Sequence, residues 1–233
     1  MIEQSAKAIV LGLFFGDVFG QLSENLFSEQ LPQNIHIYKT PNPAILDAFN
    51  ELENSSRHNR MLDSTNLVLA CLLGMRPNFK ISGNQVANPA FATITHLSYL
   101  ATTETPIEAY MQHVWDTCSG QDETFDMTVR KIGHVLGWGS TRHAMRHLSE
   151  SGDNAALVTL VMYCIMRYPD NLEQALQLSL AAPIDHHMVC ILTSALLTLH
   201  LGSSAIPQVW QQKIEAEIDI QQYVTLLMSK YKV

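Results

Sequence analysis

The sequence is poor in charged residues, and it lacks basic clusters, paired-cysteine motifs and targeting segments. Charged residues make up 15% of its 233 positions and hydrophobic residues 47%, so the chain is too apolar to be disordered. Its 14 Lys and Arg residues form no cluster and its net charge is −8, which disfavours general nucleic-acid binding. We therefore expect one globular domain over residues 1–233 with a substantial core.

Cysteine motifs and targeting segments are also missing. The four cysteines are Cys71, Cys118, Cys164 and Cys190, and they include no CxxC pair. Cys71, Cys164 and Cys190 lie in apolar runs, which predicts buried free thiols and a reducing compartment. The apolar stretch from Ala8 to Gly20 contains Asp17 and is too short to span a bilayer. It also has no basic segment before it and no cleavage site after it, so we expect a soluble cytoplasmic protein with no membrane partner.

Sustained alternation of polar and apolar residues is absent, which argues against β-structure, whereas helical signals run through the chain. The predicted fold is all-α, compact and multi-helical. The segment 186–201 is apolar on every side, so we expect it to be a central buried helix. The predicted helices cover approximately residues 5–21, 44–53, 64–75, 90–101, 105–117, 125–134, 141–149, 154–168, 170–181, 186–201 and 207–233.

The first predicted helix carries a stripe of glycines and a carboxylate. Gly12, Gly16 and Gly20 are spaced i, i+4, i+8 and share one helix face, where their small size favours close approach of another backbone. Asp17 stands among apolar residues in the same helix. A buried carboxylate needs partners, and we expect backbone amides or an arginine to supply them.

Two other acids begin predicted helices. Asp63 precedes the helix 64–75 and Asp185 precedes the helix 186–201, and helix capping is the simplest explanation for each. Both are followed by further ligand-type side chains, in Asp63-Ser64-Thr65 and Asp185-His186-His187. If the two helix N-termini met in space, they would form a metal or anion site.

The ordered set of these motifs resembles the ADP-ribosylglycohydrolase family, which includes ADP-ribosylarginine hydrolases and dinitrogenase-reductase-activating glycohydrolases. Gly16-Asp17-Val18-Phe19-Gly20 with Glu24 is similar to the family pattern G-D-x-x-G-x-x-x-E. Leu62-Asp63-Ser64-Thr65 falls where the family has T-D-D-T. Asp185-His186-His187-Met188 falls where it has D-x-D-T.

Three shorter segments extend the resemblance. Ser82-Gly83-Asn84 is similar to the family's S-G-N-G segment, and Leu136-Gly137-Trp138-Gly139 to its glycine-rich loop. Leu201-Gly202 and Ala205-Ile206-Pro207 with Trp210 match its closing Y-G-x-x-A-I-P-x-x-W pattern.

The resemblance implies an all-α fold with a centre of two Mg²⁺ (or Mn²⁺) ions, which orient the ribose hydroxyls and a water that attacks C1″ of ADP-ribose. It implies ADP-ribose or an ADP-ribosylated protein as the partner. The implied catalytic residues are Glu24 and Asp63, and the implied metal ligands are Asp63, Ser64, Asp185 and His187. The implied substrate-binding residues are Ser82, Gly83, Asn84, Gly137, Trp138, Gly139 and His186.

The sequence departs from the family pattern at the metal ligands themselves. Leu62 and Met188 replace hydroxyl ligands, and Ser64 and His187 replace carboxylates. Two divalent ions would bring four positive charges against the two negative charges of the surviving aspartates, and magnesium requires about six hard oxygen ligands. We therefore expect no ion here, or one divalent ion.

Three interpretations remain open. The first is an ADP-ribosylglycohydrolase relative with lost or weakened hydrolysis, a pseudoenzyme that retains ADP-ribose binding. The second is a mononuclear hydrolase in which Asp63, Asp185 and His187 hold a softer ion. The third is a non-catalytic scaffold or partner-binding protein.

Two further features of the sequence have a structural and a functional interpretation. His143 and His147 have the spacing of a chelating pair, but no third ligand is evident, so we expect them to be solvent-exposed. Trp138 between two glycines is suited either to stacking on a ligand or to packing in the core. The sequence does not predict the oligomeric state.

Overall fold

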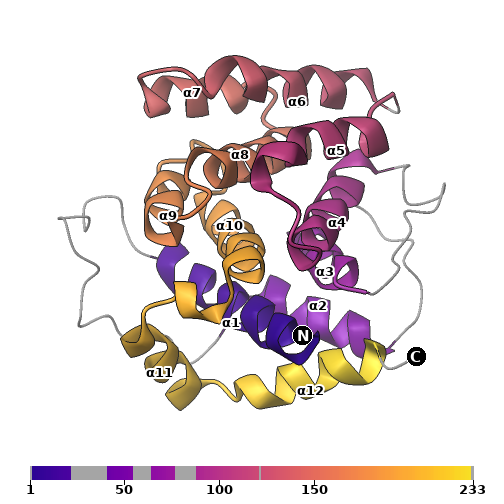
Figure 1. Cartoon of the computed structure of the whole chain (residues 1–233), viewed down its shortest axis with the longest axis vertical. Coiled ribbons are helices and arrows are strands. Elements are labelled where there is room, and N and C mark those ends of the chain that lie inside the picture. The colour runs from indigo at the N-terminus through magenta and orange to yellow at the C-terminus, as the bar shows by residue number, and fades with distance from the viewer. Residues whose placement is uncertain (1, 22–40, 55–63, 77–87, 121, 232–233) are drawn as a thin grey trace.

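The computed structural model describes residues 2–21, 41–54, 64–76, 88–120 and 122–231, and in these ranges it contains twelve α-helices and no strand (Figure 1). The prediction of an all-α fold is confirmed. The helices are α1 (Ile2–Gly20), α2 (Pro43–Asn54), α3 (Ser64–Gly74), α4 (Pro89–Thr102), α5 (Tyr110–Cys118), α6 (Glu123–Val135), α7 (Thr141–Leu148), α8 (Asn154–Arg167), α9 (Leu172–Leu180), α10 (His186–Leu201), α11 (Gln208–Glu217) and α12 (Ile220–Tyr231).

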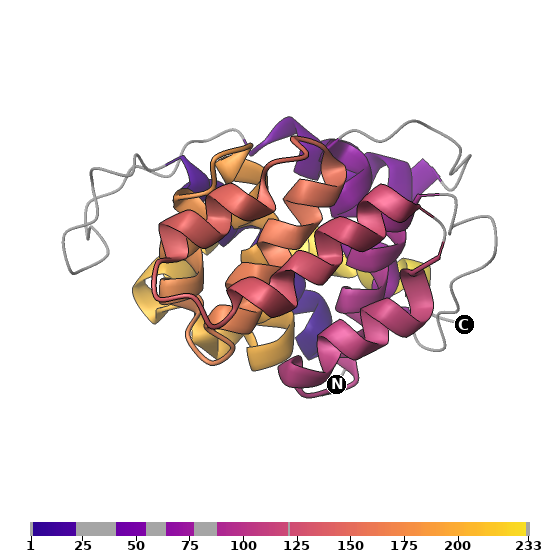
Figure 2. The same ribbon diagram turned by 90° about the horizontal axis from the view of Figure 1, so that it is seen from above.

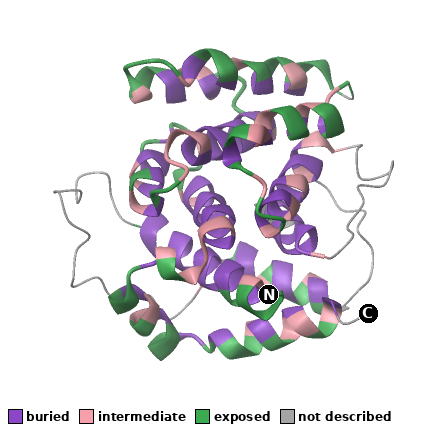
Figure 3. Ribbon diagram, viewed as in Figure 1, coloured by how far each residue is buried: buried purple, intermediate pink, exposed green. Residues whose placement is uncertain are grey.

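Helix α10 is the central element of the fold. It contacts α1, α3, α4, α8 and α9, and twelve consecutive residues from Met188 to Leu199 are buried (Figure 3). This confirms the expectation drawn from its apolar sequence. A helix without a polar face is stable only when neighbouring elements cover it on all sides.

Helices α1 and α10 form the most extensive contact in the molecule, and the glycine stripe is the reason they can approach so closely. A Cβ on Gly12 would lie 2.9 Å from Cα of Ala195, and one on Gly16 would lie 2.6 Å from the carbonyl oxygen of Cys190. Gly20 lies against the side chain of His187. The order of these contacts makes the helices antiparallel, so the C-terminal end of α1 meets the N-terminal end of α10.

The remaining helices form layers on either side of this pair. Helices α11 and α12 lie along one end of the molecule in Figure 1, while α6 and α7 form an outer layer at the opposite end. Figure 2 shows α6 and α7 crossing over α5 and α8. Helix α7 packs on α6 and α8, and α8 in turn packs on the central helix α10.

Three local predictions are wrong, each at a helix end. Thr105 caps no helix, because a 3₁₀ turn, η2 (Ile107–Ala109), precedes α5 and has no side-chain cap. Asn171 rather than Asp170 caps α9, through a bond from the Gln174 amide at 3.0 Å. The predicted C-terminal helix is broken after α11, where Asp219 accepts the Gln222 amide and starts α12.

All four cysteines are buried and unpaired, which the sequence predicted for Cys71, Cys164 and Cys190. Burial raises the pKa of Cys71 and of Cys164 to about 12, so these thiols stay protonated and unreactive at neutral pH. In the described part of the chain, no helix has both the length and the apolar character needed to cross a bilayer.

Candidate functional site

The candidate site lies where the C-terminal end of α1 meets the N-terminal end of α10. Asp17 comes from α1, and Asp185, His186 and His187 come from the first turn of α10 and its cap. Residues 17 and 187 are 170 positions apart, and the antiparallel packing over the glycine stripe brings them into contact. Two of the sequence motifs therefore meet in space.

Asp17 binds three parts of the chain at once. Its Oδ1 accepts hydrogen bonds from Nε2 of His187 at 2.8 Å and from Nε2 of Gln21 at 3.2 Å. Its Oδ2 accepts the backbone N–H of Asn42 at 2.9 Å, which joins the segment before α2 to the end of α1. Asp17 is only 3% exposed, and these bonds supply the partners that a buried carboxylate requires.

The sequence predicted the backbone amide but not the histidine among the partners of Asp17. Nothing in a local pattern links residue 17 to residue 187, since the contact arises from the packing of two whole helices. Asn42 and Gln21 were likewise not identified from the sequence. The only available signal was the i, i+4 spacing of Asp17 and Gln21 on one helix face.

The contact with Asp17 fixes the protonation of one nitrogen of His187. Nε2 lies 2.8 Å from Asp17 Oδ1 and also 3.1 Å from the backbone carbonyl oxygen of Asp17. A carbonyl oxygen can only accept a hydrogen bond, so Nε2 must carry the proton and has no lone pair left for a metal ion. Only Nδ1 of His187 could ligate.

The same contact changes the acid–base behaviour of the imidazole. The hydrogen bond to Asp17 raises the pKa of His187, and the charge of Asp185 adds to the effect, while partial burial opposes it. When the imidazole is protonated, it places a positive charge beside Asp17. In the family pattern, the corresponding position carries an aspartate, which would place a negative charge there.

Asp185 and His186 complete the described part of the site. Asp185 is exposed and caps α10, accepting the Met188 amide at 3.2 Å. Its backbone is in the left-handed region at φ 29°, which is unusual for a residue other than glycine and is concentrated at functional positions in proteins. His186 is exposed, so it is available to a ligand that approaches the helix N-terminus.

This donor set does not fit two hard cations. One carboxylate oxygen of Asp185 accepts a helix amide, His187 offers at most one nitrogen, and the Met188 side chain is buried and apolar. Magnesium prefers oxygen ligands in octahedral geometry. Among the described residues, no group of three His, Cys, Asp or Glu side chains is close enough to hold a metal ion.

The glycine-bracketed loop of residues 137–139 lies next to the C-terminal end of α8, and its approach to the candidate site stays a prediction. Its position is set by α8, where Nη1 of Arg167 donates to the Leu136 carbonyl at 3.0 Å. That end of α8 leads to Asp170, which shares a cavity with Leu201 at the C-terminal end of α10. The 16-residue helix α10 is about 24 Å long, with His187 near its first residue and Leu201 at its last.

Several predicted site residues cannot be placed. Glu24, Asp63, Ser82, Gly83 and Asn84 lie outside the described residues, and Ser64 is described only as the first residue of α3. Helix α3 contacts α10, as a site shared between their ends would require. The proposed approach of Asp63 to Asp185 stays a prediction.

Comparison with known families supports the resemblance found in the motifs. A family model described as ADP-ribosylglycohydrolase matches residues 83–232, which is 150 of the 233 residues. The match includes α10 and the closing segment around Trp210, and it begins after the first metal motif. No curated protein matches the chain. Since the match covers more than half of the sequence, the chain belongs to the ADP-ribosylglycohydrolase family.

Proposed function

We propose that this protein binds ADP-ribose or an ADP-ribosylated protein at the junction of α1 and α10, and that its hydrolytic activity is lost or strongly weakened. Family membership supports the ligand class. The observation that carries the loss of hydrolysis is the contact between His187 and Asp17 at 2.8 Å. This hydrogen bond occupies the side chain of His187, which stands at a metal-ligand position of the family pattern.

The chemistry of the family depends on divalent ions that orient the ribose and the attacking water. In this chain the motifs lose two carboxylates, at Ser64 and His187, and two hydroxyl ligands, at Leu62 and Met188. Binding needs less than catalysis, because hydroxyl and phosphate groups of a ligand can be held by hydrogen bonds alone. His186 and the backbone amides of His186 and His187 at the start of α10 are suited to that task.

The experiment is a thermal unfolding series with ADP-ribose, run once with EDTA and once with magnesium. A ligand at a hundredfold excess over its Kd stabilises the folded state by ~2.7 kcal/mol. For a chain of this size each kcal/mol moves the Tm by about 2–4 °C. We expect an upward shift of similar size in both buffers and no release of ADP-ribose from ADP-ribosylated arginine.

His186→Ala provides the variant and His134→Ala its matched control, because both side chains are exposed and lie on different helices. We expect the first to reduce the shift and the second to leave it unchanged. No shift at millimolar ADP-ribose would reject binding and favour the scaffold interpretation. Hydrolysis that requires one bound ion, lost in Asp185→Ala, would instead favour the mononuclear enzyme.

A further inference from the structure

The segment of residues 127–149, which covers most of α6 and all of α7, is rich in positive charge in a chain that is acidic overall. Residues 127–149 contain four of the 14 Lys and Arg residues and three of the ten histidines, but no Asp or Glu. The sequence shows no basic run because the four Lys and Arg residues are spread over 17 positions, from Arg130 to Arg146. The fold turns the segment back on itself at residues 136–140, so both halves belong to one outer layer.

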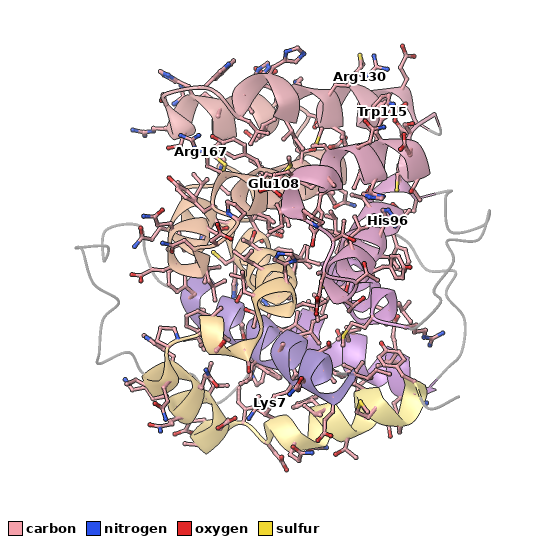
Figure 4. The ribbon with its side chains drawn as sticks, viewed as in Figure 1. Lys7, His96, Glu108, Trp115, Arg130 and Arg167 are labelled. Carbon is pink, nitrogen blue, oxygen red and sulfur yellow. The ribbon has the colours of Figure 1, made fainter. Side chains whose placement is uncertain are left out.

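Two of the four Lys and Arg side chains, Lys131 and Arg130, already have partners within the fold. Nζ of Lys131 pairs with Glu150 at 3.0 Å, and Glu150 also accepts from Nδ1 of His147 at 3.0 Å. These two contacts lower the pKa of Glu150. The Arg130 guanidinium lies over the ring of Trp115, 4.5 Å from its centroid, where α6 crosses α5 (Figure 4).

Arg142 and Arg146 have no such partner. They are exposed on α7, and no carboxylate of the described residues lies within ion-pair distance of either. Their i, i+4 spacing places them one above the other on the same helix face, with about 5–6 Å between their Cβ atoms. Together they form a paired cationic site that nothing within the described fold uses.

An exposed aromatic ring packs on the same helix, α7, that carries these arginines. Trp138 is 39% exposed, and its ring stacks on that of His147, with centroids 5.5 Å apart and an interplanar angle of 23°. His147 directly follows Arg146 on α7, so the stacked rings and the two guanidinium groups lie on neighbouring faces of one helix. The indole is therefore held in position without being buried.

The two glycines beside Trp138 are not required by the fold. Neither has a positive φ, and a Cβ added to Gly137 or Gly139 would meet no atom within 4 Å. By contrast, Gly12 and Gly16 of α1 would collide with α10. The glycines therefore add no further side chain next to Trp138, whose indole stacks on His147.

We propose that Trp138, Arg142 and Arg146 form a binding surface for nucleoside phosphates, separate from the junction of α1 and α10. A base stacks on the indole, and the phosphate groups pair with the two guanidinium groups, which are the side chains best matched to phosphate geometry. The same chemistry is presented by a single strand of nucleic acid and by a free nucleotide. The small number of cations suits a short strand or a nucleotide rather than a duplex.

The test is fluorescence anisotropy of a labelled single-stranded 12-mer, with unlabelled 12-mer, AMP and ADP-ribose as competitors at two salt concentrations. We expect binding that Trp138→Ala weakens about tenfold and that Trp138→Phe largely retains, since one stacked base contributes a factor of that order. Each arginine removed in the pair Arg142→Ala and Arg146→Ala lowers the slope of log K against log salt by ~0.7.

Lys213→Ala is the matched control, because Nζ of Lys213 also lies over a tryptophan, 5.3 Å from the Trp210 ring centroid, but on α11 in the opposite layer. Competition by the 12-mer but not by AMP assigns the surface to a strand, and equal competition assigns it to a free nucleotide. No binding by any of the three, or binding that the Trp138 and arginine variants do not change, overturns the proposal. Because ADP-ribose is itself a nucleoside phosphate, Trp138→Ala and His186→Ala together tell which of the two sites it occupies.

Discussion

At the scale of single residues, one substitution in the family pattern has a visible structural consequence. His187 reaches over Gly20 to Asp17, and the contact is made possible by the absence of a side chain on Gly20. A protonated imidazole brings one positive charge to this carboxylate. The ion pair thereby provides Asp17 with a cation from within the protein.

This ion pair predicts a pH-dependent contribution to stability. The folded-state pKa of His187 is raised by Asp17, with a smaller effect from Asp185, so folding favours the protonated imidazole. The contribution is fully present below the ordinary histidine pKa of about 6.5 and is lost as the pH rises through the raised folded pKa.

Denaturant unfolding of the wild type and of His187→Gln from pH 5 to pH 9 measures this contribution. We expect the difference in unfolding free energy between them to be largest at low pH and to shrink as the pH rises. Other titrating groups cancel in the difference. A difference that is constant across the range would mean that His187 does not pair with Asp17 as a charged group.

A second residue-scale prediction concerns Glu104, which follows α4 at φ 54°. The Thr105 amide donates to the Leu100 carbonyl at 3.2 Å, which closes a turn whose left-handed residue is normally glycine. Glu104→Gly should therefore raise the unfolding free energy by about 1 kcal/mol, seen as a Tm increase of about 2–4 °C. Gly152→Ala, at φ 67°, should lower the Tm, and a stabilising effect there would contradict the reasoning.

At the scale of the elements, the packing of α1 on α10 depends on glycine. A methyl group on Gly16 would lie within 2.6–2.8 Å of three atoms of α10, two of them backbone atoms that cannot move aside. Gly16→Ala should therefore lower the unfolding free energy by at least about 1–3 kcal/mol, measured by denaturant titration.

Gly133 in α6 is the control for this substitution, because a Cβ there meets no atom within 4 Å. Gly133→Ala should be neutral or stabilising by up to ~1 kcal/mol, since alanine is the better helix former. Equal effects of the two substitutions would show that helix propensity, rather than contact with α10, determines the cost at Gly16.

The sequence predicted the helices where burial and capping act locally, and failed where the outcome depends on neighbours. The apolar run of α10 and the cap at Asp185 needed only adjacent residues to be recognised. Thr105 and Asp170 matched the capping pattern, but a 3₁₀ turn precedes α5 and Asn171 is the residue that caps α9. The break between α11 and α12 lets Ile218 and Ile220 both become buried, which depends on the surface beneath them.

At the scale of the whole molecule, the motifs predicted that the family site would be altered, but not what replaced it. The aspartate-to-histidine change at residue 187 is visible in the sequence, whereas its partner lies 170 residues away. The basic surface on α6 and α7 was likewise hidden, because it forms only when two helices fold back beside each other. Both features depend on contacts between elements that are distant in the sequence or separated by a turn.

The central claim is that this chain does not hold the pair of divalent ions on which its family generally depends, because His187 pairs with Asp17. The most direct measurement is the number of Mn²⁺ ions bound per chain, determined by electron paramagnetic resonance on protein purified without chelators. The account predicts no tight pair of ions and the same result for wild type and Asp185→Ala. Two ions bound per wild-type chain at micromolar Mn²⁺, and lost in Asp185→Ala, would contradict it.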